Sequence, residues 1–144
     1  MDIVTHALAG AATGAAFGRP VLGAVVAVVP DSALWLRPRL AAPPPLYRAA
    51  HGGLAPVLIS TFCLMLFGPE IALVVFWAWA SHIVLDIPTH GKLWSPRLFW
   101  PDETPVFEQF QEWEWFNRSW FTGLGIALIW SAVWLLMCLV LPVS

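Results

Sequence analysis

The chain has 144 residues, of which 59% are apolar and only 11% are charged, and its formal net charge is −2. Soluble domains carry about 25% charged residues, so this chain has too few polar side chains to cover a soluble globule or to remain disordered. The small negative charge provides no basic surface, and we expect no nucleic-acid partner. A mean hydropathy of +0.73 predicts an integral membrane protein instead.

Apolar stretches predict a single transmembrane domain that covers residues 1–144. A span needs about 20 apolar residues, so several stretches reach that length only when they are extended through a titratable residue. Gly18-Arg19-Pro20 and Phe67-Gly68-Pro69 predict tight turns between neighbouring helices. The predicted fold class is therefore all-α, an integral membrane bundle of about five transmembrane helices over 3–17, 20–36, 52–68, 70–87 and 119–141.

The longest connection, 88–118, mixes tryptophan and phenylalanine with glutamate. Aromatic side chains beside charged ones are typical of the lipid–water interface. The sequence therefore predicts an interfacial, aromatic-rich segment and contacts with membrane lipids.

Alternating the predicted helices across a membrane places the histidines and two aspartates on one side. Six of the seven basic residues fall on the same side, and only Arg19 falls on the other. The positive-inside rule makes that side cytoplasmic, together with the N-terminus. The residues that the alternation brings to this face are His6, Asp31, His51, His82, Asp86 and His90.

The spacing of these residues also predicts a chemistry. His82, Asp86 and His90 are four apart and would follow one helical face, although Pro88 should end or bend the helix near Asp86. A charged group deep in a bilayer costs about 2.5–3.5 kcal/mol, which a bound cation would offset. Imidazole and carboxylate are ligands for divalent metals, with zinc expected first and iron or manganese as alternatives.

Several motifs resemble the YdjM-like family, small bacterial inner-membrane proteins described as predicted membrane-bound metal-dependent hydrolases. The resemblance covers most of residues 1–101 and is carried by Thr5-His6, Pro30-Asp31, His51, the run Ser81 to Gly91, and Phe99-Trp100-Pro101. That family is similar to the zinc-dependent phospholipase C and P1-nuclease group. The resemblance implies a multi-pass protein of the bacterial inner membrane, with metal ligands at His6, Asp31, His51, His82 and Asp86.

Two positions depart from the family pattern. Ala33 stands where many relatives carry a second aspartate, and Leu46 where many carry a histidine. These departures favour a mononuclear site, with His90 as a replacement ligand or as the general acid–base. Arg48, three residues before His51, would stabilise an anionic substrate oxygen.

The leading hypothesis is thus a membrane-embedded metal-dependent hydrolase in which metal-activated water attacks a phosphoester or a related bond at the cytoplasmic membrane face, with a lipid as the natural substrate. Two alternatives remain open. A proton- or ion-coupled carrier would also use intramembrane His and Asp chains, but near the membrane midplane. A non-catalytic membrane scaffold would use the same polar face to hold helices together or to bind a partner, and would bind no stoichiometric cation.

Overall fold

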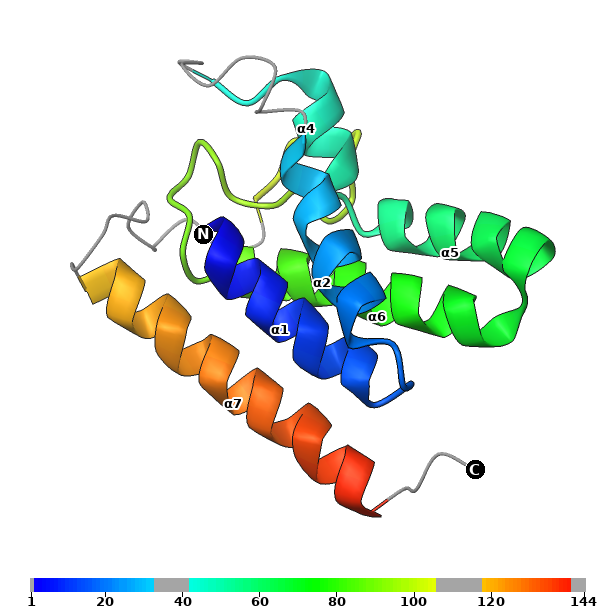
Figure 1. The fold of residues 1–144 in the computed structure, drawn as a ribbon. Coiled ribbons are helices and arrows are strands. Elements are labelled where there is room, and N and C mark those ends of the chain that lie inside the picture. Colours follow the sequence, from blue (N-terminus) through cyan, green and yellow to red (C-terminus); the bar gives the residue numbers. More distant parts are fainter. Residues whose placement is uncertain (1, 33–41, 106–117, 141–144) are drawn as a thin grey trace.

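The computed structural model describes residues 2–32, 42–105 and 118–140, and every regular element in these ranges is helical (Figure 1). The all-α expectation is confirmed for these residues. Each predicted helix has an observed counterpart, and α4 is a further helix in a stretch where none was predicted. The elements are α1 (Ile3–Ala15), α2 (Pro20–Val28), the 3-10 helix η1 (Val29–Asp31), α4 (Pro45–Ala50), α5 (Leu54–Phe67), α6 (Pro69–Asp86) and α7 (Arg118–Val140).

Two of the described helices are long and apolar enough to cross a membrane. They are α6, with 18 residues, and the 21-residue stretch Trp120–Val140 of α7. Helix α5 has 14 residues and would extend only about 21 Å, against a hydrocarbon core of about 30 Å. Helix α1 and the stretch Pro20–Asp31 are also shorter than a span. The expectation of about five full-length spans is therefore wrong for the described residues.

Glycine and proline set these shorter lengths. Gly18 and Gly68 end their helices with φ angles of 68° and 87°, a left-handed conformation that glycine adopts without strain. Pro30 falls in η1, where the backbone tightens after Val28. The prediction of a helix to residue 36 ignored this proline. Two parts of the predictions lie outside the described residues, namely 33–36 of this helix and 106–117 of the interfacial segment.

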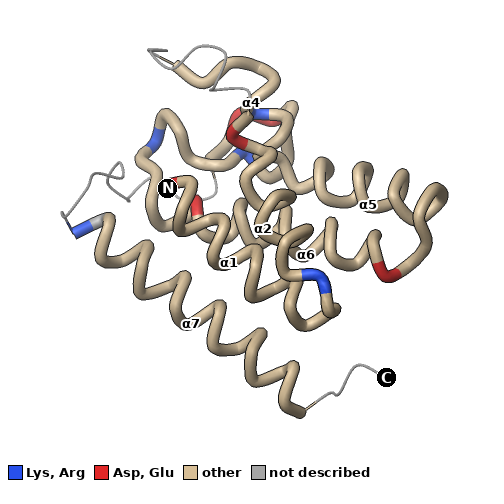
Figure 2. The backbone as a smooth tube through the Cα atoms, viewed as in Figure 1, with Lys and Arg blue, Asp and Glu red and all other residues tan. Residues whose placement is uncertain are grey.

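The two tight turns lie at the same end of the molecule. Arg19, in the turn between α1 and α2, pairs with Glu70, at the start of α6, with 3.4 Å between Nη2 and Oε2. Most other charged positions gather at the opposite end, near the N-terminus and α4 (Figure 2). Helices α5 and α6 form an antiparallel pair, and α1 lies against α2, α6 and α7.

Glycines bring α1 and α2 into close contact. A Cβ atom on Gly23 would lie 2.1 Å from the carbonyl oxygen of Gly10, and one on Gly10 would lie 2.4 Å from the Cβ of Ala27. Only small residues allow such an approach between helix backbones. The contact holds α1 at the depth that brings His6, four residues before Gly10, to the C-terminal end of α6.

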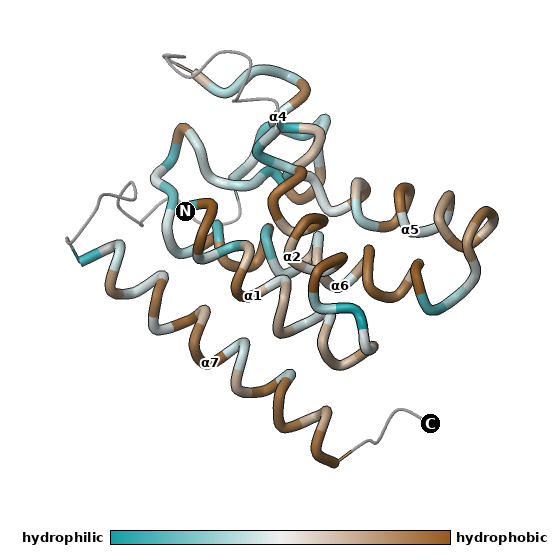
Figure 3. The backbone as a smooth tube through the Cα atoms, in the orientation of Figure 1, coloured by the Kyte–Doolittle hydropathy of each residue, from teal (hydrophilic) through white to brown (hydrophobic). Residues whose placement is uncertain are grey.

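Much of the outer surface is apolar. Leu58 and Met65 of α5 are 64% and 72% exposed, and Leu128 and Leu139 of α7 are 62% and 81% exposed. Only 17% of the apolar stretch of α7 is buried inside the molecule. Apolar residues continue along both helices (Figure 3), so these helices expose a surface that water would solvate poorly.

The glycine contact generates a first prediction. We expect Gly23→Val to lower the free energy of unfolding in detergent by about 1–3 kcal/mol, because the added atoms force α1 away from α2. Gly125→Ala in α7 is the matched control, since no atom lies within 4 Å of its added Cβ; it should change stability by less than about 1 kcal/mol. Thermal unfolding of both variants measures this, and equal effects would contradict the close contact.

Candidate metal centre

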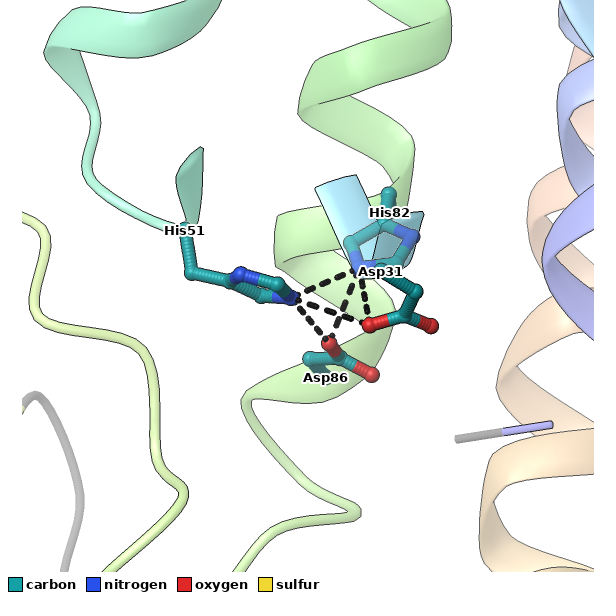
Figure 4. Close-up of side chains that lie close together, drawn as sticks. All are labelled: Asp31, His51, His82 and Asp86. Atoms are coloured by element: carbon teal, nitrogen blue, oxygen red, sulfur yellow. Dashed lines mark hydrogen bonds and ion pairs between the residues drawn. The ribbon is translucent and has the colours of Figure 1, made fainter. Parts of the chain in front are cut away.

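Four side chains from three parts of the chain converge at one end of the bundle (Figure 4). One nitrogen or oxygen from each of Asp31, His51, His82 and Asp86 lies within 4.8 Å of the others. Nε2 of His51 is 2.9 Å from Nε2 of His82. Oδ2 of Asp86 is 3.2 Å from the first nitrogen and 3.1 Å from the second. Oδ1 of Asp31 completes the group at 3.5 and 3.7 Å from the same two nitrogens.

Local structure explains the position of each side chain. His82 and Asp86 are one turn apart on α6, which ends at Asp86, as Pro88 predicted. Asp31 ends η1, the turn that contains Pro30. His51 follows α4, whose last carbonyl, at Ala50, accepts a hydrogen bond of 2.8 Å from the indole of Trp79 on α6. The sequence motifs thus meet because α2, α4 and α6 end at the same place.

Backbone carbonyls fix the tautomers of the two histidines. Nδ1 of His82 donates to the carbonyl of Ala27 at 2.7 Å, and Nδ1 of His51 donates to that of Tyr47 at 2.8 Å. Because a carbonyl oxygen can only accept, each Nδ1 carries a proton, and in the neutral ring the lone pair is on Nε2. Both lone pairs then face each other and two carboxylates. Such an arrangement repels unless a proton or a metal cation lies between these atoms.

Burial strengthens this demand for positive charge. The side chains of His82 and Asp86 are 0% exposed and that of His51 is 1% exposed, whereas Asp31 is 11% exposed. Burial lowers the pKa of His51, but hydrogen bonds to Asp31 and Asp86 outweigh it and raise that pKa to about 9. A metal cation would replace the proton that these carboxylates favour, because metal ligands bind in their deprotonated form.

The second oxygen of Asp86 faces the remaining two histidines. Oδ1 lies 3.0 Å from Nε2 of His6 and 3.4 Å from Nε2 of His90. The ring of His6 also stacks on that of His82, with centroids 3.8 Å apart. His6 therefore lies outside the four-residue group, although the family resemblance implied it as a ligand. His90, on the bend after α6, reaches the site and is 15% exposed.

Arg48 and Asp2 have other partners. Nη1 of Arg48 pairs with Oε2 of Glu103, a residue to which the sequence analysis gave no role in the site. Asp2 caps α1 by accepting from the backbone N–H and the hydroxyl of Thr5. Leu46 lies in α4 and is 67% exposed, and Ala33 lies outside the described residues.

Tyr47 is a part of the site that sequence reasoning missed. Its ring stacks on that of His51 at a centroid distance of 3.7 Å, and Trp94 meets it edge-on at 5.2 Å. The signal was present in the sequence, since Tyr47 precedes His51 by four residues, one turn of a helix. Tyr47 thus holds His51 by both its carbonyl and its ring.

Comparisons of the chain with protein-family models, with curated proteins and with solved structures gave no match. The resemblance to the YdjM-like family therefore stays a proposal, and the geometry of the site is the basis for its function.

The stacked ring generates a second prediction. We expect Tyr47→Leu to lower the free energy of unfolding by about 1 kcal/mol, because His51 loses its aromatic partner. Tyr47→Phe keeps the ring and should retain most of that stability. Thermal unfolding of the two variants side by side tests this, and a larger loss in the phenylalanine variant would show that the hydroxyl, rather than the stack, stabilises the site.

Proposed function

We propose that this chain is a membrane-embedded, metal-dependent hydrolase. Its metal ligands would be Asp31, His51, His82 and Asp86. The observation that carries the proposal is the pair of imidazole Nε2 atoms, 2.9 Å apart, whose protons are held on Nδ1 by backbone carbonyls. A cation between them turns the repulsion of four electron-rich atoms into coordination.

The ligand atoms have the spacing that a small divalent ion requires. Metal–nitrogen and metal–oxygen bonds of about 2.1 Å in a tetrahedral site place ligand atoms about 3.4 Å apart. The separations that involve the two histidines range from 2.9 to 3.7 Å, and all four atoms lie within 4.8 Å of one another. The donor set has two nitrogens and two oxygens and no sulfur. It fits zinc first, with iron or manganese as alternatives.

The apolar surfaces of α5 and α7 support a place in the membrane. Two helices have the length of a span, and the shorter ones would reach only part of the way through the hydrocarbon core. The candidate metal site lies at the end of the bundle opposite the Arg19–Glu70 pair. Most of the basic residues were expected at the end that holds the site. We therefore propose a multi-pass protein of the bacterial inner membrane, with the N-terminus and the site on the cytoplasmic face.

The site also offers parts for hydrolysis. It reaches the surface at Asp31 and His90, which are 11% and 15% exposed, so water and a substrate could approach from this side. A bound metal would lower the pKa of a coordinated water and polarise a phosphoryl oxygen. His90 would transfer a proton as general acid–base, and His6 would orient Asp86 from behind. A phosphoester, with a lipid headgroup as its nearest source, is the proposed substrate.

The carrier alternative is less well supported. Among the described residues, the buried histidines and aspartates all lie at one end of the bundle. Thr13, a buried polar residue farther along α1, has no ionisable group. Its hydroxyl donates to the carbonyl of Ala9 and accepts from the indole N–H of Trp130. A carrier would place its ionisable groups near the midplane.

A scaffold would bind no stoichiometric metal, and metal content therefore separates it from a hydrolase.

The third prediction concerns metal content. Detergent-purified protein should hold about one zinc, iron or manganese ion per chain, and the His82→Ala/Asp86→Ala variant should hold almost none, because two of four ligands are gone. Glu70→Gln, which removes an exposed carboxylate at the opposite end, should keep the full content. Elemental mass spectrometry measures all three.

Folding is controlled within the same experiment. Asp86→Asn keeps the size of the side chain but weakens coordination, so it should lose metal while retaining the helical circular dichroism of the parent. If neither parent nor variants bind metal after reconstitution with each cation, the hydrolase proposal fails.

The fourth prediction concerns His90. With the metal content unchanged, His90→Gln should lower the rate of phosphoester hydrolysis by about 100-fold, because proton transfer by a positioned side chain contributes a factor of this order. Hydrolysis of a chromogenic phosphodiester by metal-loaded protein measures it. An unchanged rate at full metal occupancy would remove His90 from the mechanism.

A further inference from the structure

Arg97 is a buried cation in the loop that covers the site. Its side chain is 7% exposed. Nη2 donates to the carbonyl of Lys92 at 2.9 Å. Among the described residues, neither Nε nor Nη1 of Arg97 has a hydrogen-bond partner. A guanidinium that loses water without gaining a counter-charge is strongly destabilising, so an arrangement of this kind points to an anionic ligand.

Two other described arginines have a counter-charge, and Arg118, at the start of α7, is exposed to solvent. Arg48 pairs with Glu103, and Arg19 pairs with Glu70. No described carboxylate pairs with Arg97. Its planar group has one N–H on Nε and two on Nη1 without an acceptor. Such donors, with the second N–H of Nη2 completing a fork, match the oxygens of a phosphate or carboxylate.

The backbone places Arg97 between the two segments that carry His51 and His90. A Cβ atom on Gly52, the residue after His51, would lie 3.5 Å from the carbonyl oxygen of Arg97. The N–H of Gly53 donates to the carbonyl of Leu98 at 2.9 Å. On the other side, Lys92, which accepts from the guanidinium, follows His90 by two residues. The backbone of Arg97 therefore lies beside the residue that follows His51, and its guanidinium lies against the carbonyl of Lys92, two residues after His90.

We propose that the guanidinium of Arg97 binds an oxyanion of phosphate chemistry beside the metal centre. The role of this anion as substrate rests on the proposed function, because a phosphoester held by Arg97 would present its phosphorus to the metal-bound water. The anion site itself does not depend on that function. Two sources share the chemistry, a free phosphate or phosphomonoester and the headgroup of an anionic phospholipid.

The test is a titration of the full, detergent-purified chain with inorganic phosphate, measured by isothermal titration calorimetry. Arg97→Gln should raise the Kd by about tenfold or more, the size expected for losing charge-assisted hydrogen bonds. Arg97→Lys keeps the charge but not the fork and should raise the Kd about threefold. Arg19→Gln, at the far end, should leave the Kd within about twofold of the parent.

A second arm replaces phosphate with a short-chain phosphatidylglycerol below its critical micelle concentration. Binding of this lipid that is lost in Arg97→Gln, without binding of inorganic phosphate, supports the site and identifies the headgroup as the source. Binding of neither probe to the parent overturns the inference, as does an equal loss in Arg97→Gln and Arg19→Gln. If Arg97→Gln does not fold, the Arg97→Lys titration decides, and an unchanged Kd there overturns the fork.

Metal content keeps this inference separate from the proposed function. Both titrations are repeated on chelator-treated protein. Phosphate binding that requires Arg97 in a chain that holds no metal supports the anion site while the hydrolase proposal fails. If Arg97→Gln holds its full metal content and binds phosphate with unchanged affinity, the anion site is overturned, and the proposal of a metal centre is unaffected.

Discussion

Two buried imidazoles that present their Nε2 atoms to each other are the constraint on which this structure depends. The carbonyl of Ala27 orients His82, and the carbonyl of Tyr47 orients His51. The first of these bonds ties α2 to α6, whereas the second lies within α4 and its C-terminal residue. The hydrogen bond from Trp79 of α6 to the carbonyl of Ala50 joins α4 to α6, so the packing of the three elements positions the two rings. Asp31 and Asp86 add negative charge to the same small volume. The arrangement is stable only when a positive charge, a proton or a cation, occupies it. In the proposed function a metal supplies that charge, and metal binding and local folding would then be parts of one equilibrium.

The rest of the bundle isolates this charge from the apolar surroundings. The contact between Gly10 and Gly23 brings α1 close enough for His6 to reach Asp86, whose two oxygens serve different partners. Exposed leucine and methionine side chains of α5 and α7 cover the outside. The loop after α6 adds Arg97, a buried cation whose backbone lies beside the residue that follows His51. A metal and an anion would each compensate groups that cost several kcal/mol when buried alone.

Helix positions could be predicted from the sequence because glycine and proline mark the turns at Gly18 and Gly68, and because Pro88 ends α6. The convergence of the histidines and aspartates followed from alternation alone. Helix length could not be predicted from hydropathy, since the apolar run 20–30 continues unbroken where the backbone changes from α-helix to the 3-10 helix η1 at Pro30. The stack of Tyr47 on His51 is local and follows from their four-residue spacing once α4 is recognised as a helix. The burial of Arg97 could not be predicted from the sequence, because it depends on how α4 and the loop after α6 fold over each other, and Arg97 resembles an ordinary interfacial basic residue until its partners are counted.

X-ray absorption spectroscopy of the zinc-loaded protein tests the central claim most directly, because it reports the atoms around the metal rather than its amount. A metal held by two histidines and two aspartates should show a shell of nitrogen and oxygen atoms at about 2.0–2.1 Å, with the outer-shell scattering of two imidazoles and no sulfur. In Asp86→Asn the spectrum should change or the metal should be lost. A sulfur shell at about 2.3 Å, or a spectrum that Asp86→Asn leaves unchanged, would place the metal elsewhere and contradict its binding by the histidine and aspartate cluster.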